Sequence, residues 1–137
     1  MRLYIYIVHM EWIMTPETVF SAASTLAMIG WLVLIAGIVL KRDLLRDTIA
    51  GRAIPLVLSA AYTVLMVAFC WTSDGGFDSL GNVQKLFTSP WAAVAGWVHY
   101  LAFDLAIGAW LSRQIMHGGL SRLYLVPVLP LTFLFGP

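Results

Sequence analysis

The sequence predicts an all-α integral membrane protein, a bundle of four transmembrane helices. Hydrophobic residues make up 61% of the 137 residues and charged residues only 11%, against roughly 45–50% and 25% in soluble domains. The mean hydropathy is +0.86. A spanning helix needs about 20 apolar residues, and apolar stretches of this kind predict helices near 17–40, 53–71, 90–114 and 121–137.

The composition also limits the partners. A net charge of +1 favours neither a nucleic acid nor an acidic partner, so the expected partner is membrane lipid. The single cysteine, Cys70, excludes an internal disulfide and a cysteine-based metal cluster. We interpret it as a small hydrophobic residue on a helix face.

Residues 1–13 are interpreted as an N-terminal extension, and residues 14–137 as the transmembrane domain. The extension is apolar but too short to span a membrane. The helix start follows it, with Thr15 as the N-cap, Pro16 at the first helical position and Glu17 in the first turn. Residues 1–13 are then either a non-native upstream start or a short amphipathic helix on the membrane surface.

The first helix, near 17–40, is uncharged from residue 19 onwards, and its small residues favour packing against other helices. The charged stretch 41–52 is predicted as a connection. The second helix, near 53–71, has Pro55 in its first turn, where the missing N–H costs little. Tyr62 and Thr63 are groups on this helix that could hydrogen-bond inward.

Residues 72–90 form the long loop of the predicted fold. Gly75-Gly76 and Gly81-Asn82 are turn signals. Between and after them, apolar residues recur at roughly helical spacing. We expect one or two turns of interfacial helix over the mouth of the bundle, acting either as a lid or as a connector.

The third helix, near 90–114, begins with Pro90 after the plausible N-cap Ser89. The fourth, near 121–137, contains Pro127 and Pro130, which predict a kink. Seventeen residues cover only about 25 Å. The sequence therefore leads us to expect either a short last helix or a chain that has lost its natural C-terminus.

The basic residues predict an orientation. The connections after the first and third helices hold six of the eight lysines and arginines, namely Lys41, Arg42, Arg46, Arg52, Arg113 and Arg122. By the positive-inside rule these connections are cytoplasmic. Both termini and the long loop are then expected on the non-cytoplasmic side.

Two ionisable side chains, His99 and Asp104, lie in the middle of the third helix. Intramembrane ionisable groups usually face a protein interior or a cavity and suggest a functional site. Five residues apart, the two are about 140° apart around the helix, so they can border one broad inward face with Tyr100, Phe103 and Ile107. Tyr62, Thr63 and Tyr100 are the expected hydrogen-bond partners of Asp104. No second histidine or acidic side chain is available at this depth, so no metal site is predicted.

Three uses of this face remain open. A buried network could simply hold the helices together. A ligand-binding or catalytic site could use the neutral carboxyl group of Asp104 as a proton donor and the neutral imidazole of His99 as an acceptor. The same two groups could instead belong to a proton or ion path.

The motif from Trp97 to Trp110, WVHYLAFDLAIGAW, resembles the signature of the abscisic-acid-deficient-four-like proteins. The stretch MTPETVFSAASTLAMIGWLVLI and the ending LTFLFGP are similar to the family's first and last helices. The resemblance covers about residues 14–137 and implies a small four-helix membrane protein linked to neoxanthin synthesis. A plant transit peptide is absent, which points to a bacterial member in the inner membrane.

The resemblance implies carotenoid chemistry, the isomerisation of violaxanthin, an epoxide, to neoxanthin, an allene. Asp104 would be the acid at the epoxide oxygen, and His99 the base or a positioning group. Tyr100, Phe103, Ile107, Tyr62 and Thr63 would contact the substrate, and no cofactor is expected. The alternatives are a non-catalytic membrane assembly protein, as a homo-oligomer or within a larger complex, and a small transporter or proton relay.

Overall fold

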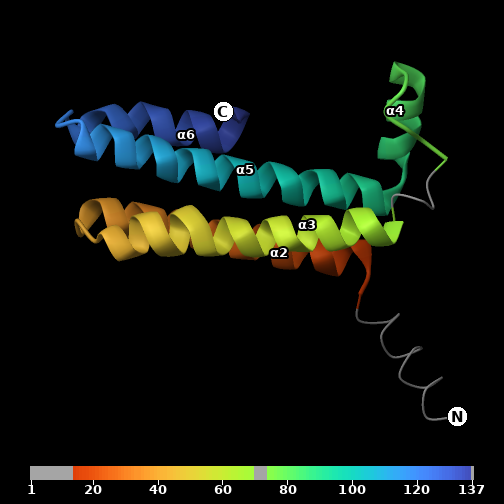
Figure 1. The fold of residues 1–137 in the computed structure, drawn as a ribbon, viewed down its shortest axis with the longest axis horizontal. Coiled ribbons are helices and arrows are strands. Elements are labelled where there is room, and N and C mark those ends of the chain that lie inside the picture. Colours follow the sequence, from red (N-terminus) through yellow and green to blue (C-terminus); the bar gives the residue numbers. More distant parts are fainter. Residues whose placement is uncertain (1–13, 70–73, 137) are drawn as a thin grey trace, which may run out of the picture.

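The computed structural model describes residues 14–69 and 74–136, and every regular element in these ranges is helical (Figure 1). Three of the helices are long and apolar enough to cross a membrane. The elements are α2 (Pro16–Val39), η1 (Leu44–Ala53), α3 (Ile54–Phe69), α4 (Leu80–Thr88), α5 (Pro90–His117), η3 (Arg122–Tyr124) and α6 (Leu125–Phe135).

The start of α2 confirms the predicted helix start. The Thr15 side chain accepts a hydrogen bond from the Thr18 backbone N–H at 3.2 Å, and the Thr18 hydroxyl accepts one from the Thr15 backbone N–H at 2.8 Å. Pro16 occupies the first turn. This reciprocal capping satisfies donors that a helix start otherwise leaves unpaired. The preceding residues 1–13, predicted as an extension, lie outside the described residues.

The predicted charged connection over 41–52 is wrong. The link is only a short turn after α2, in which Lys41 has a φ of 54°. From Leu44 the chain is helical as the ten-residue π-helix η1, which continues directly into α3. The second span is therefore Leu44–Phe69. Arg46 is buried and paired with Asp43 and Asp47. Lys41, Arg42 and Arg52 are exposed. Residues 70–71 of the predicted helix lie outside the described residues.

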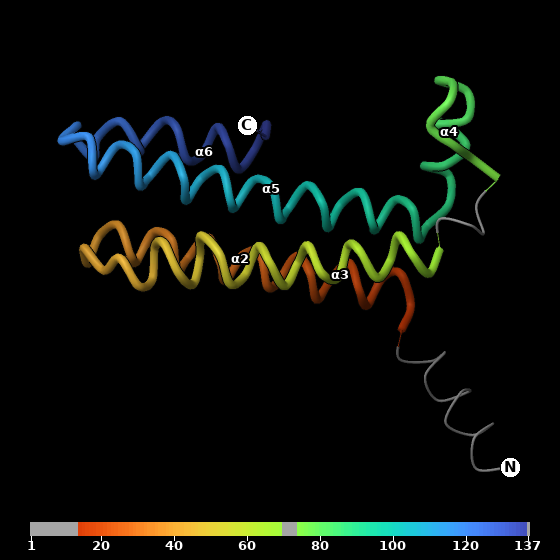
Figure 2. The backbone as a smooth tube through the Cα atoms, viewed as in Figure 1, coloured from red at the N-terminus to blue at the C-terminus, as the bar shows by residue number. Residues whose placement is uncertain are grey.

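The helix predicted in the long loop is confirmed as α4, whereas its position at the membrane interface stays a prediction. Residues 72 and 73 of that loop lie outside the described residues. The Ser79 side chain caps its start by accepting a hydrogen bond from the Asn82 backbone at 3.2 Å. The Asn82 side chain donates to both oxygens of Asp78 at 2.9 and 3.1 Å, which holds the pKa of that carboxyl group below its usual value. Figure 2 shows α4 standing across the end of α5.

The central element is α5, which packs against every other long helix. Its start at Pro90 is as predicted, and it continues to His117, three residues beyond the predicted end. Gly108 lies under the ring of Trp31 from α2, where an added Cβ would stand 2.7 Å from the ring. Gly30 of α2 gives similar close access to Leu105. Small residues thus let α2 and α5 approach closely, as is common in membrane bundles.

The fourth transmembrane helix is not confirmed. After the 3-10 turn η3, the 11-residue helix α6 contains Pro130 and ends at Phe135. Together these elements cover about 21 Å at 1.5 Å per residue, less than the roughly 30 Å of a hydrocarbon core. Figure 1 shows α6 lying along one half of α5, with its C-terminal end near the middle of that helix.

Candidate functional site

Asp104 is buried in the middle of α5, with only 2% of its surface exposed. Its Oδ1 atom has no hydrogen-bond partner among the described residues. The Tyr100 hydroxyl, one helical turn away, interacts with the carboxyl group. Gly136, just after α6, lies beside both, since a Cβ there would stand 3.7 Å from the hydroxyl and 3.8 Å from Oδ1. The expected inward orientation of Asp104 is confirmed.

Two of the three expected hydrogen-bond partners of Asp104, Tyr62 and Thr63, make other contacts. The Thr63 side chain is exposed, and its hydroxyl donates to the Ser59 carbonyl oxygen of its own helix at 2.9 Å. Tyr62 packs its ring against the ring of His99 instead, with the centroids 4.9 Å apart. Tyr100, the third expected partner and also an expected substrate contact, lies beside the carboxyl group.

His99 lines a pocket between α3, α4 and α5. The pocket has a volume of about 200 Å³, and aromatic and aliphatic side chains form most of its wall. Phe69 and Trp91 stack at one side with their ring centroids 4.1 Å apart. Tyr62 and His99 are the titratable side chains of the lining, which consists of Tyr62, Leu65, Met66, Phe69, Phe77, Leu86, Phe87, Trp91, Ala92, Ala95, Gly96 and His99.

The structure does not bring His99 and Asp104 into one cavity. The pocket around His99 does not include Asp104, Phe103, Ile107 or Thr63. Phe103 is 52% exposed and stacks on His99 from outside the pocket. His99 packs against Tyr62 of α3, whereas Asp104 lies beside Gly136 after α6, so the two groups lie on different faces of α5.

An aromatic row leads to Asp104 along the contact between α2 and α5. Phe20 stacks on Trp97 at 5.4 Å, and Trp97 stacks on Tyr100 at 5.6 Å. The Trp97 indole N–H donates to the Ser24 hydroxyl at 3.0 Å and fixes the row. Sequence reasoning missed this row. The helical spacing of Phe20 with Ser24, and of Trp97 with Tyr100, is the pattern that indicates it.

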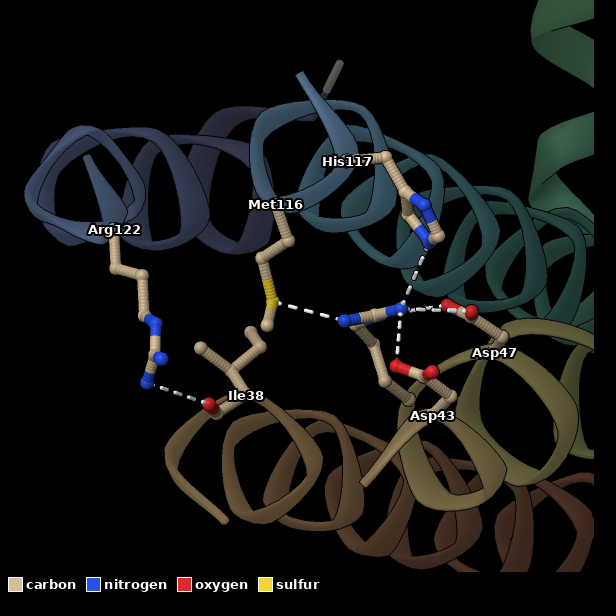
Figure 3. A network of polar contacts seen from close by, with 7 residues as sticks. Ile38, Asp43, Asp47, Met116, His117 and Arg122 are labelled. Carbon is tan, nitrogen blue, oxygen red and sulfur yellow. Dashed lines mark hydrogen bonds and ion pairs between the residues drawn. The ribbon is translucent and has the colours of Figure 1, made fainter. Parts of the chain in front are cut away.

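A polar network closes the other end of the bundle, where Arg46 is only 1% exposed (Figure 3). The guanidinium group is paired with Asp47 at 2.7 Å and with Asp43 at 2.8 Å. It also donates to the Met116 sulfur at 3.0 Å and lies 3.4 Å from the His117 Nε2 atom. These contacts tie η1 to the end of α5.

A neighbouring contact ties the last connection to α2, because Arg122 donates to the Ile38 carbonyl oxygen at 3.4 Å. With its acidic partners and the Met116 and His117 contacts, the buried Arg46 is well satisfied, so the network serves the fold. Within residues 14–69 and 74–136, no three histidine, cysteine or acidic side chains are grouped closely enough to hold a metal ion.

Comparison with known proteins found one family and no individual relative. Neither the curated proteins nor the solved structures gave a match. A family model described as ABA DEFICIENT 4-like matches residues 18–137. With its three apolar helices long enough to span a membrane, the chain fits a membrane protein related to neoxanthin synthase. Because the match covers nearly the whole chain, the protein belongs to the ABA DEFICIENT 4-like family.

Proposed function

We propose that this protein binds a carotenoid, or a lipid of similar length and polarity, within the membrane and isomerises one of its ends. The observation that carries the proposal is the apolar pocket between α3, α4 and α5, with His99 and Tyr62 in its wall. Membership of the ABA DEFICIENT 4-like family supports a ligand of this class.

The pocket suits one end of a long ligand. Sites that enclose a whole drug-sized molecule have volumes of about 300–1,000 Å³, and this pocket has about 200 Å³. A cyclic end group would lie between the Phe69–Trp91 stack and His99, while the rest of the chain remains among lipids. Leu86 and Phe87 of α4 form part of the wall, so α4 serves as the lid over this end group.

The chemistry requires an acid and a base at the same end group. Opening an epoxide to an allene needs a proton at the epoxide oxygen and removal of a proton from a neighbouring carbon. The C–O bond breaks, a C=C bond forms, and the two proton transfers balance, so no oxidant or reductant is consumed. In this pocket the Tyr62 hydroxyl is the proposed proton donor and the His99 imidazole the proposed base, because both line it.

Asp104 is a second candidate reaction centre. The specific observation is its buried Oδ1 atom, which lacks a hydrogen-bond partner among the described residues. A carboxyl group at this depth is a functional candidate by default. With Tyr100 beside it, it would act as the acid on a ligand that follows the aromatic row between α2 and α5.

The test is conversion of violaxanthin to neoxanthin in bacteria that make violaxanthin and express the full chain. We expect His99→Phe and Tyr62→Phe to lower conversion at least tenfold, while Asp104→Asn retains it. Tyr124→Phe is the matched control, because Tyr124 is 59% exposed and lies outside the pocket. If only Asp104→Asn abolishes conversion, the reaction takes place at Asp104, and the assignment to the pocket around His99 is wrong.

A second measurement separates binding from chemistry. The absorption spectrum of protein purified from its native membrane should contain the bands of a bound carotenoid. Trp91→Ala removes one side of the ring stack and should reduce the pigment bound per protein. A protein that purifies without pigment and without conversion would favour the non-catalytic assembly role instead.

A further inference from the structure

A second pocket lies in the groove between η1 and α5, near the end of the bundle opposite α4. Its volume is about 200 Å³. Arg52 comes from η1, and Arg113 comes from the last turns of α5 with Trp110 nearby. Unlike the pocket around His99, its lining is mainly polar and consists of Asp47, Gly51, Arg52, Ala106, Ala109, Trp110 and Arg113.

The two arginines of this pocket are available to bind an anionic ligand. Asp47 is the carboxylate in the lining, and both of its oxygens accept hydrogen bonds from Arg46, at 2.7 and 2.8 Å. Among the described residues, no carboxylate lies within ion-pair distance of Arg52 or Arg113. Arg52 is exposed and Arg113 is half-buried, so both can turn their guanidinium groups towards the pocket.

The lengths of the helices put the pocket at the depth expected for lipid headgroups. Arg52 precedes the end of α3 by 17 residues, or about 26 Å, and Arg113 follows Trp91 by 22 residues, or about 33 Å. A hydrocarbon core is about 30 Å thick. Both arginines therefore stand about one core thickness from the far ends of their helices. Trp110 is 45% exposed beside them, as expected for an aromatic side chain at the interface.

We propose that this pocket binds the phosphate group of an anionic phospholipid whose acyl chain lies along α5, towards the exposed Phe103. The planar guanidinium groups of Arg52 and Arg113 match the geometry of phosphate oxygens. Basic pockets between transmembrane helices are typical headgroup sites. One leaflet of the core is about 15 Å thick, or about ten residues of helix, so the chain would end near Phe103. The site is independent of the proposed isomerisation.

The test is a titration of the detergent-solubilised full chain with short-chain phosphatidylglycerol, with thermal stability as the readout. Phosphatidylcholine and inorganic phosphate are titrated in parallel, to separate a lipid headgroup from free phosphate. We expect phosphatidylglycerol to raise the unfolding temperature far more than either control does. An arginine that faces an anionic headgroup contributes about fivefold in affinity, so Arg52→Gln/Arg113→Gln should weaken binding about thirtyfold.

The matched control is Lys41→Gln/Arg42→Gln, which removes two exposed charges from the same end outside the pocket. It should bind like the wild type. If the pocket variant does not fold, Arg113→Lys can be tested instead. It keeps the positive charge but lacks the planar guanidinium group, so it should still weaken binding severalfold. Equal weakening in both double variants would overturn the site, because the attraction would then be general. An equal response to inorganic phosphate would overturn the lipid assignment.

Discussion

Gly37→Ala should destabilise the protein, because η1 and α2 are in close contact at Gly37. A Cβ atom at this position would lie 2.6 Å from the Arg46 backbone nitrogen and 3.0 Å from its Cα atom. These are backbone atoms, so no flexible side chain can move aside. The two helices would have to separate, although Arg46 is held by its ion pairs at the same point.

The size of the effect follows from two opposing terms. Overpacking a tight contact costs about 1–3 kcal/mol. Replacing glycine with alanine inside a helix returns up to about 1 kcal/mol. We therefore expect Gly37→Ala to lower the free energy of unfolding by about 1–2 kcal/mol.

The control for this substitution is Gly81→Ala in α4. Apart from its chain neighbours and the nearby backbone of its own helix, no described atom lies within 4 Å of a Cβ built at Gly81. Only the helix-propensity term remains, so stability should be unchanged or higher by up to about 1 kcal/mol. Unfolding of the full chain in mixed micelles, titrated with sodium dodecyl sulfate, can be followed by tryptophan fluorescence. A Gly37→Ala variant that is as stable as Gly81→Ala would refute the close contact between η1 and α2.

Four further outcomes are expected. Arg46→Met should lower the free energy of unfolding by about 2–4 kcal/mol, because it leaves Asp47 without its ion-pair partner. A double-mutant cycle with Asp47→Asn that shows no interaction energy between the two positions would contradict this. Asp104→Asn should change the free energy of unfolding little, since Oδ1 has no hydrogen-bond partner among the described residues. A decrease of more than about 2 kcal/mol would reveal a structural role. In a chain with Cys70 replaced by alanine, a cysteine at residue 74 should be labelled from outside and one at residue 120 only from the cytoplasm, and the reverse pattern would invert the topology. A chain starting at Met14 should insert and melt like the full chain, and a large drop in its melting temperature would assign residues 1–13 to the bundle.

Local chemistry made the helix starts predictable from the sequence. Thr15 with Pro16, and Ser89 with Pro90, combine a turn residue with the one residue that suits only the first turn of a helix. These signals depend on neighbouring residues alone. Both helices therefore begin within a residue of the predicted position. The burial of Asp104 was predictable for a different reason, since a carboxyl group facing lipid is costly.

The misread parts depend on contacts between distant residues. The stretch from residue 41 to 52 has the charge of a loop, but acidic partners along η1 and the end of α5 allow Arg46 to be buried. The relation between His99 and Asp104 depends on what packs against each face of α5. The sequence sets their angle, whereas the positions of Tyr62 and Gly136 decide that the two groups open to different sides.

The π-helical form of η1 determines in which direction around the helix axis the side chains of α3 point. A hydrogen-bonded turn of π-helix holds about one residue more than a turn of α-helix. Compared with ten α-helical residues, the ten residues of η1 therefore turn α3 by nearly half a turn less around its axis. Substitutions keep this direction, but the loss of one or two residues from η1 would change it. The loss of two residues, about 200° at 3.6 residues per turn, would turn Tyr62 away from His99 and exchange the lipid-facing and pocket-facing sides of α3. The composition of the pocket is thus fixed by the number of residues near the opposite membrane surface.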